Sequence, residues 1–269
     1  SAAAAAAFDF ATAGSPWPVS ATTEAEALVE QMSMEEKYSL LYGHTGPYDG
    51  NVPGVPRLGI PSLQLQDGAS GVATKISNVT CFPSSLTLAA TWDTALASAY
   101  GGAICEEEKA KGANVWLAPY VNLQRVPWGG RAYETLGEDP VLVAAMAAAE
   151  IQGCQSRGVC AVAKHLSDYN DCAKASADQS FYNAVVPHRA QMELYTHAFR
   201  KAVEVGVASV MCSYNQVNGT QACEDSVALS NLRATRPGGL GFRGWVVSDW
   251  YVPHSTSLFV FPAHLTFIR

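Results

Sequence analysis

A carboxylate and a large aromatic ring, Asp249 and Trp250, follow directly after a short apolar run near the end of the sequence. The run covers residues 245–248 and is preceded by a glycine, which predicts a strand buried on both faces. In α/β folds, residues that follow the carboxyl end of such a strand lie in a ligand pocket. A carboxylate that stays ionised in a dry pocket can attack an acetal carbon. Asp249 is therefore a candidate nucleophile, although an aspartate in this position can also serve only as the cap of a following helix.

Polar side chains follow the other predicted strands as well. They are Asp67 after residues 62–66, Arg125 and Arg131 on the loop after 114–118, Lys164 and His165 after 159–163, and Tyr214 after 208–212. Carboxylates and cations hydrogen-bond the hydroxyls of a sugar, and an aromatic ring covers its apolar face. The set therefore indicates a neutral ligand rich in hydroxyl groups. We also expect the nearby cations to lower the pKa of Asp249 and keep it ionised.

Each of these residues also has a simpler interpretation. Asp67 precedes a glycine, a pair that is common in turns. Lys164 and His165 can form a surface turn, and Tyr214 can be a core ring with a satisfied hydroxyl. Arg131 can brace its own loop by pairing with the acids that follow it, Glu134, Glu138 and Asp139. The prediction of a binding site depends on all these side chains meeting around one sugar ring.

Helices are predicted between these strands and before the first of them. The expected ranges are 93–111, 139–153, 187–205 and 226–234, with capping-box patterns at Thr23 and Ser33 marking two earlier helix starts. Strands that alternate with helices predict a parallel sheet, either a (β/α) barrel or an open doubly wound sheet. Neither a GxGxxG nor a GxxxxGK[ST] motif follows a strand, so a nucleotide-binding fold loses support.

The composition is that of a globular protein with a large core. Apolar residues make up 48% and charged residues 15% of the 269 residues. The net charge of -7 argues against a nucleic-acid or anionic-membrane partner. No apolar run approaches the roughly 18 to 20 residues needed to span a bilayer.

Cysteines and glycosylation sequons favour an extracellular protein. The sequence has seven cysteines but no CxxC pair, so we expect disulfides rather than a zinc site. Sequons occur at Asn78 and Asn218, and Cys212 and Cys223 bracket the second one, where they can staple a loop. We therefore expect a secreted glycoprotein.

Several stretches resemble the N-terminal barrel domain of the family 3 glycoside hydrolases, the β-glucosidase and β-xylosidase group. The matching residues occur in the family's order, at 65–68, 114–119, 129–131 with Glu134 and 138–140, 163–165, 209–215 and 241–250. The resemblance implies a (β/α)8-type TIM barrel over residues 21–254, incomplete at its C-terminal end. Residues 1–20 would be a flexible lead-in and residues 255–269 a divergent tail.

The resemblance also implies roles for the candidate residues. Asp249 would be the nucleophile of a retaining mechanism that needs no metal or cofactor. The innermost sugar would be held by Asp67, Arg131, Lys164, His165, Met211, Tyr214 and Trp250. A tryptophan after the nucleophile is more like the β-glucosidases, so we expect terminal β-D-glucosyl residues of β-glucosides or cello-oligosaccharides as substrate. A β-xylosidase and a non-catalytic sugar-binding remnant remain alternatives, as does a product that never folds.

The sequence departs from the family pattern at three places. Residues 166–171 differ from the usual stretch after Lys164 and His165, and the family's further substrate-binding arginine is replaced by Lys174 as the nearest cation. Residues 233–240 form a longer loop than usual. After residue 255 the sequence diverges, and the second domain that supplies the family's acid/base carboxylate is not found. We therefore expect impaired turnover, because losing a general acid/base costs about 100 to 10,000-fold in rate.

Overall fold

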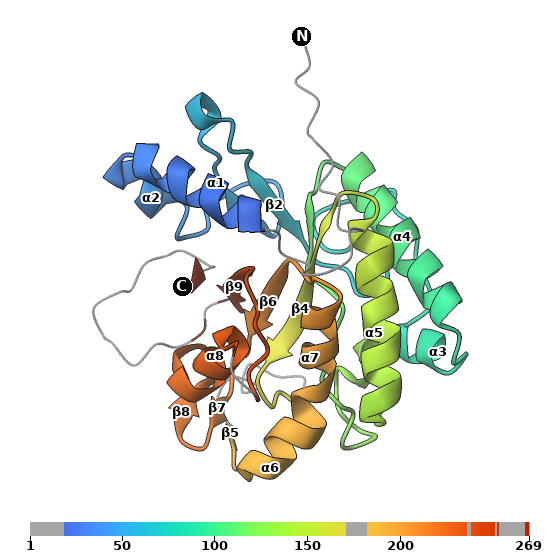
Figure 1. The fold of residues 1–269 in the computed structure, drawn as a ribbon. Coiled ribbons are helices and arrows are strands. Elements are labelled where there is room, and N and C mark those ends of the chain that lie inside the picture. Colours follow the sequence, from blue (N-terminus) through green and yellow to red (C-terminus); the bar gives the residue numbers. More distant parts are fainter. Residues whose placement is uncertain (1–18, 171–181, 236–237, 251, 253–266, 269) are drawn as a thin grey trace.

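The computed structural model describes residues 19–170, 182–235, 238–250, 252 and 267–268. Most of the predicted lead-in and tail lies outside these residues, as does Lys174. The described elements form a mixed sheet with helices packed beside it, an α/β fold (Figure 1). No described helix is both long and apolar enough to span a bilayer.

Five parallel strands form the centre of the main sheet. They are β2 (Leu63–Gln66), β3 (Val115–Trp116), β4 (Cys160–Leu166), β6 (Ser209–Cys212) and β9 (Trp245–Ser248), side by side in that order. Each overlaps a stretch predicted to be a strand, but β4 extends to Leu166, so Lys164 and His165 lie within it and not after it as predicted. Parallel strands whose neighbours are far apart in sequence need crossover connections, and the helices between them supply these.

The two edges of this sheet differ from the predicted barrel. β1 (Gly50–Val52) pairs antiparallel with β2, and β10 (Phe267–Ile268) pairs antiparallel with β9. The described strands therefore form an open mixed sheet, and the prediction of a TIM barrel is supported only as far as an α/β fold with parallel central strands. Neither edge strand carries a long apolar run in the sequence, so their antiparallel pairing was not predicted.

Three helices lie along one face of the sheet: α4 (Thr94–Ala110), α5 (Pro140–Gln155) and α7 (His197–Glu204) (Figure 1). Asp93 and Asp139 cap α4 and α5 by accepting two backbone N–H groups each, as predicted. The first two helices cross closely at Gly153, where an added Cβ would lie 1.9 Å from the Ser98 carbonyl oxygen. Small residues at the crossing therefore set the distance between these helices.

Five further α-helices are described. They are α1 (Val19–Gln31), α2 (Met34–Ser39), α3 (Ser85–Ala89), α6 (His188–Ala190) and α8 (Ser226–Arg233). The capping box at Ser33 is present, but α1 begins at Val19, so Thr23 lies inside a helix and the predicted start there was wrong. The helix predicted over 187–205 is interrupted by a π-helical turn over Gln191–Tyr195.

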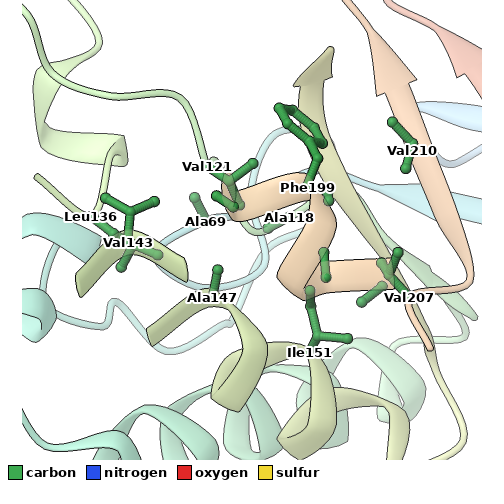
Figure 2. Close-up of a cluster of buried hydrophobic side chains, with 14 of the residues drawn as sticks. Ala69, Ala118, Val121, Leu136, Val143, Ala147, Ile151, Phe199, Val207 and Val210 are labelled. Atoms are coloured by element: carbon green, nitrogen blue, oxygen red, sulfur yellow. The ribbon is translucent and has the colours of Figure 1, made fainter. Parts of the chain in front are cut away.

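Buried side chains from these helices and the sheet form a large core cluster, and a second cluster lies around Met211. Figure 2 shows Val143, Ala147 and Ile151 of α5 with Phe199 of α7 and Val210 of β6. All five are nearly inaccessible to solvent. Burying a Val, Ile or Phe side chain stabilises a fold by about 1.5–3 kcal/mol, so this layer holds the strand ends in place.

Two disulfides add covalent links. Cys105 in α4 is bonded to Cys154 in α5, and Cys212 at the end of β6 is bonded to Cys223. The second link confirms the predicted staple. Its loop contains a hairpin, β7 (Gln216–Val217) and β8 (Thr220–Gln221), that forms a small separate sheet with β5 (Asn183–Ala184).

Candidate active site

A pocket of about 730 Å³ lies at the carboxyl ends of the parallel strands. All eight residues predicted to bind or attack a sugar line it: Asp67, Arg131, Lys164, His165, Met211, Tyr214, Asp249 and Trp250. The two predicted aspartates, Asp67 and Asp249, therefore face the same space. Arg125 does not line this pocket and instead lies over the ring of Tyr195, 5.9 Å from its centroid.

Asp249 follows β9 directly and is 7% exposed. Its Oδ1 accepts a hydrogen bond of 2.8 Å from the backbone N–H of Trp250, and its Oδ2 lies 3.4 Å from Nε2 of His165. Burial raises the pKa of Asp249 to about 6, against the opposing charges of Arg131 and Lys164. The two cations do lower this pKa, as expected, but desolvation of the carboxylate outweighs them and the net shift is upward. The carboxylate is still mainly ionised at neutral pH.

His165 is held in place from several sides. Its backbone N–H donates to Asn122 Oδ1 at 2.8 Å, and its carbonyl oxygen accepts from Asn122 Nδ2 at 2.9 Å. The imidazole meets the rings of Tyr120 and Tyr169 edge-on, with centroids 4.7 and 5.0 Å away. Burial lowers the pKa of His165 well below its usual value, with Arg131 and Lys164 contributing, so the ring beside Asp249 is neutral.

Asp67 and Lys164 form an ion pair across the floor of the pocket. Lys164 Nζ donates to Asp67 Oδ1 at 2.7 Å, and the lysine side chain is 3% exposed against 41% for the aspartate. Burial on its own would raise the pKa of Asp67, but the charge and hydrogen bond of Lys164 hold it below its usual value. The pair therefore presents an ionised carboxylate and an ammonium group to a ligand. Lys164 and His165 are buried in β4, so the alternative of a surface turn at these two residues is wrong.

Arg131 combines the two interpretations that the sequence allowed. Its Nε and one terminal nitrogen donate to the two oxygens of Glu134 at 2.7 and 2.8 Å, so it braces its own loop. The guanidinium also lies 4.9 Å from the centroid of the Tyr120 ring and lines the pocket. A paired, planar cation of this kind keeps a fixed orientation toward a ligand.

Tyr214 and Trp250 form aromatic parts of the wall. Burial raises the pKa of Tyr214, and the charge of Asp249 raises it further, so its hydroxyl stays protonated. The Trp250 indole N–H donates to the carbonyl oxygen of Asp49 at 3.2 Å. Met211 in β6 packs among the buried side chains behind the pocket, including Val162 and Val247.

Asp49 is a pocket residue that sequence reasoning missed. Its backbone carbonyl oxygen accepts the bond from Trp250. Its side-chain Oδ2 accepts from Gln66 Nε2 at 3.0 Å, from the Asp67 backbone N–H at 3.1 Å and from Thr74 Oγ1 at 2.6 Å. It lies in a loop rich in Gly and Pro, before β1, and not at the end of a parallel strand. Its position could have been found only from the antiparallel pairing of β1 with β2.

The described residues give no indication of a metal centre: within them, no three His, Cys, Asp or Glu side chains are grouped as metal ligands. The pocket instead combines carboxylates, cations, a neutral histidine and aromatic rings at the ends of parallel strands. This combination is typical of α/β enzymes that act on carbohydrates.

The chain belongs to glycosyl hydrolase family 3, whose N terminal domain it matches over residues 54–261. It is 40% identical to β-glucosidase 2 of Saccharomycopsis fibuligera over 247 residues, which are 86% of this chain and 28% of that protein. Its structure is similar to that of DesR, a β-glucosidase from Streptomyces venezuelae in complex with D-glucose, with 37% identity, a TM-score of 0.79 and coverage of 86% and 29%. It is also similar to β-D-glucoside glucohydrolase from Trichoderma reesei, with 37% identity, a TM-score of 0.80 and coverage of 90% and 34%. The chain thus spans about a third or less of the length of these relatives.

Proposed function

We propose that the protein takes part in retaining hydrolysis of terminal β-D-glucosyl residues, with Asp249 as the nucleophile. The single observation that carries this proposal is the position of Asp249, buried at the end of β9 in a pocket that also holds the Asp67–Lys164 pair. A glucosyl ring in this pocket would receive hydrogen bonds from Asp67, Lys164 and Arg131. Its apolar face would lie against Trp250.

The acid/base of the reaction is a separate question. A retaining mechanism needs a second carboxyl group about 5 to 5.5 Å from the nucleophile. Asp49, Asp67 and Glu134 also line the pocket, but each accepts hydrogen bonds from neighbouring donors: Thr74 for Asp49, Lys164 for Asp67 and Arg131 for Glu134. These carboxylate oxygens are already engaged with donors of the fold. We therefore propose that the acid/base lies outside the described residues.

We extend the proposal to the complete fold of the domain and to the secretion of the protein. The five parallel strands would be part of a (β/α)8 barrel within a domain over residues 21–254, because their carboxyl ends carry the pocket. Two disulfides support secretion, since such bonds persist in oxidising compartments. The partner is a β-glucoside or a cello-oligosaccharide.

The nucleophile is tested with 2,4-dinitrophenyl 2-deoxy-2-fluoro-β-D-glucoside. Dinitrophenolate leaves without protonation, so the first step needs no general acid, and the fluorine slows hydrolysis of the covalent intermediate. We expect release of one dinitrophenolate per protein and a glycosyl adduct on Asp249 by peptide mass spectrometry. The Asp249→Asn variant is the control and should give neither.

The outcomes separate the alternatives. An adduct on another residue, or none in a folded protein that gives a cooperative thermal melt, would contradict the proposed mechanism. Glucose binding by calorimetry without an adduct would instead support a sugar-binding protein. Running the matched fluoroxyloside in parallel tests the β-xylosidase alternative, which predicts faster labelling by that reagent.

A further inference from the structure

The two glycosylation sequons lie in different structural settings. Asn78 and Asn218 are both exposed and both have positive φ, 58° and 49°, which asparagine tolerates better than most residues. Exposure alone therefore does not distinguish them. The difference lies in what their side-chain amides do.

The amide of Asn218 extends the small sheet. Its Oδ1 accepts from the Val186 backbone N–H at 3.0 Å, and its Nδ2 donates to the Val186 carbonyl oxygen at 3.0 Å. The side-chain amide of Asn218 bonds to both the N–H and the carbonyl oxygen of Val186. Of the two hydrogens on Nδ2, the one that is donated is therefore the hydrogen on the same side as Oδ1. An N-linked sugar replaces that hydrogen, since the planar amide keeps its substituent trans to the side chain. Glycosylation of Asn218 therefore removes the link between this turn and residues 183–186.

The amide of Asn78 has no hydrogen-bond partner among the described residues, while the backbone around it is fixed. Lys111 Nζ donates to the Asn78 carbonyl oxygen at 2.8 Å, and the Thr80 N–H and hydroxyl both bond to Glu107. A sugar on this amide breaks no bond of the described fold. The next residues in sequence, Val79, Thr80 and Cys81, line the pocket.

We propose that Asn78, and not Asn218, carries an N-linked oligosaccharide, and that this glycan stands at the rim of the pocket. The proposal rests on the secretion proposed above but not on hydrolysis. The glycan would cover the edge of the pocket formed by residues 79–81. Cys81, whose thiol is free and exposed, lies on this edge, so the reactivity of this thiol measures whether the glycan covers it.

The experiment uses the whole chain secreted from a eukaryotic host, trimmed to one N-acetylglucosamine per site and mapped by peptide mass spectrometry. We expect the remnant on Asn78 and an unmodified Asn218. The Asn78→Gln variant should lose all N-linked sugar, and Asn218→Gln should keep it while melting at a lower temperature. Occupancy of Asn218 in the folded protein, or a bare Asn78 in a secreted protein, would overturn the assignment.

The position of the glycan is tested on the untrimmed protein by the rate at which a maleimide labels Cys81, read at peptide level. We expect severalfold slower labelling in the glycosylated protein than in Asn78→Gln. Equal rates would overturn the placement at the rim. Both readouts are independent of the adduct on Asp249, so a failure of the mechanism is distinguishable from a failure of this inference.

Discussion

At the scale of single residues, burial and charge act against each other at Asp249. The pKa of this carboxyl is raised to about 6 by desolvation, in spite of two nearby cations. A group whose folded-state pKa is raised in this way is protonated, and unable to attack, in a wider acidic range than an exposed aspartate. The pH dependence of the proposed reaction would therefore report directly on the environment of Asp249.

We expect the pH profile of kcat/KM for dinitrophenyl β-glucoside to have an acidic limb with an apparent pKa near 6, below which kcat/KM falls about tenfold per pH unit. Replacing Lys164 with Met should move this limb to higher pH, because Lys164 is one of the cations that oppose protonation. Lys201→Met, at an exposed position of α7 outside the pocket lining, removes the same charge and serves as the control. A limb that stays in place in Lys164→Met would contradict this account of the pKa.

Asp49 is the second residue whose role can be tested alone. We expect Asp49→Ala to weaken glucose binding by about tenfold, because the Asp67 backbone N–H and the Thr74 hydroxyl lose a shared side-chain acceptor worth about 1–2 kcal/mol. Calorimetry measures the affinity, and near-ultraviolet circular dichroism reports on the indole. Asp93→Ala, which removes the cap of α4, should lower stability by about 1 kcal/mol and leave glucose affinity unchanged. Equal affinity losses in the two variants would show that Asp49 acts only through stability.

At the scale of elements, the close crossing of α4 and α5 positions the loops at the strand ends. We expect Gly153→Ala to destabilise the protein by about 1–3 kcal/mol, since its Cβ would lie 1.9 Å from the Ser98 carbonyl oxygen. The matched control is Gly102→Ala in α4, where the nearest atoms are 3.4 Å away and alanine favours the helix. Urea denaturation measures both, and a neutral Gly153→Ala would show that the helices can move apart.

Elements also show how far sequence reasoning reaches. The parallel strands and capped helices were predictable because apolar runs and caps are local signals, and polar residues at the strand ends marked the site. The edge strands β1 and β10 and Asp49 were not, because each depends on pairing with residues outside its own segment. No local signal in the sequence marked the π-helical turn. The roles of the pocket residues in catalysis stay predictions until the labelling experiment is done.

At the scale of the whole molecule, a buried carboxyl outside the pocket makes stability depend on pH. Glu108 in α4 is fully buried, and neither of its oxygens has a hydrogen-bond partner among the described residues. Burial raises its pKa to about 9, with the charges of Asp67 and Asp49 adding to the effect. Below about pH 4.3 the folded and unfolded states are both protonated, so this group has no effect on stability there. As pH rises above that value, the unfolded chain loses its proton and the folded chain does not, so stability is lost.

We therefore expect Glu108→Gln to raise the free energy of unfolding by on the order of 2 kcal/mol at pH 7 and to change it little at pH 4. Urea titrations across this pH range measure the difference. Glu106→Gln is the control, because that side chain is exposed on the same helix and should give no such pH dependence. A gain that is equal at both pH values would mean that repacking and not ionisation is responsible.

The bond between Cys212 and Cys223 encloses Tyr214 and the β7–β8 hairpin in one short covalent loop. In a cell with a reducing interior this bond would not form, and the end of the loop at Cys223 would no longer be linked to β6. Low turnover measured on such material would result from the missing disulfide and not from the sequence of the protein. Counting titratable thiols in each preparation is thus the first step in any kinetic comparison.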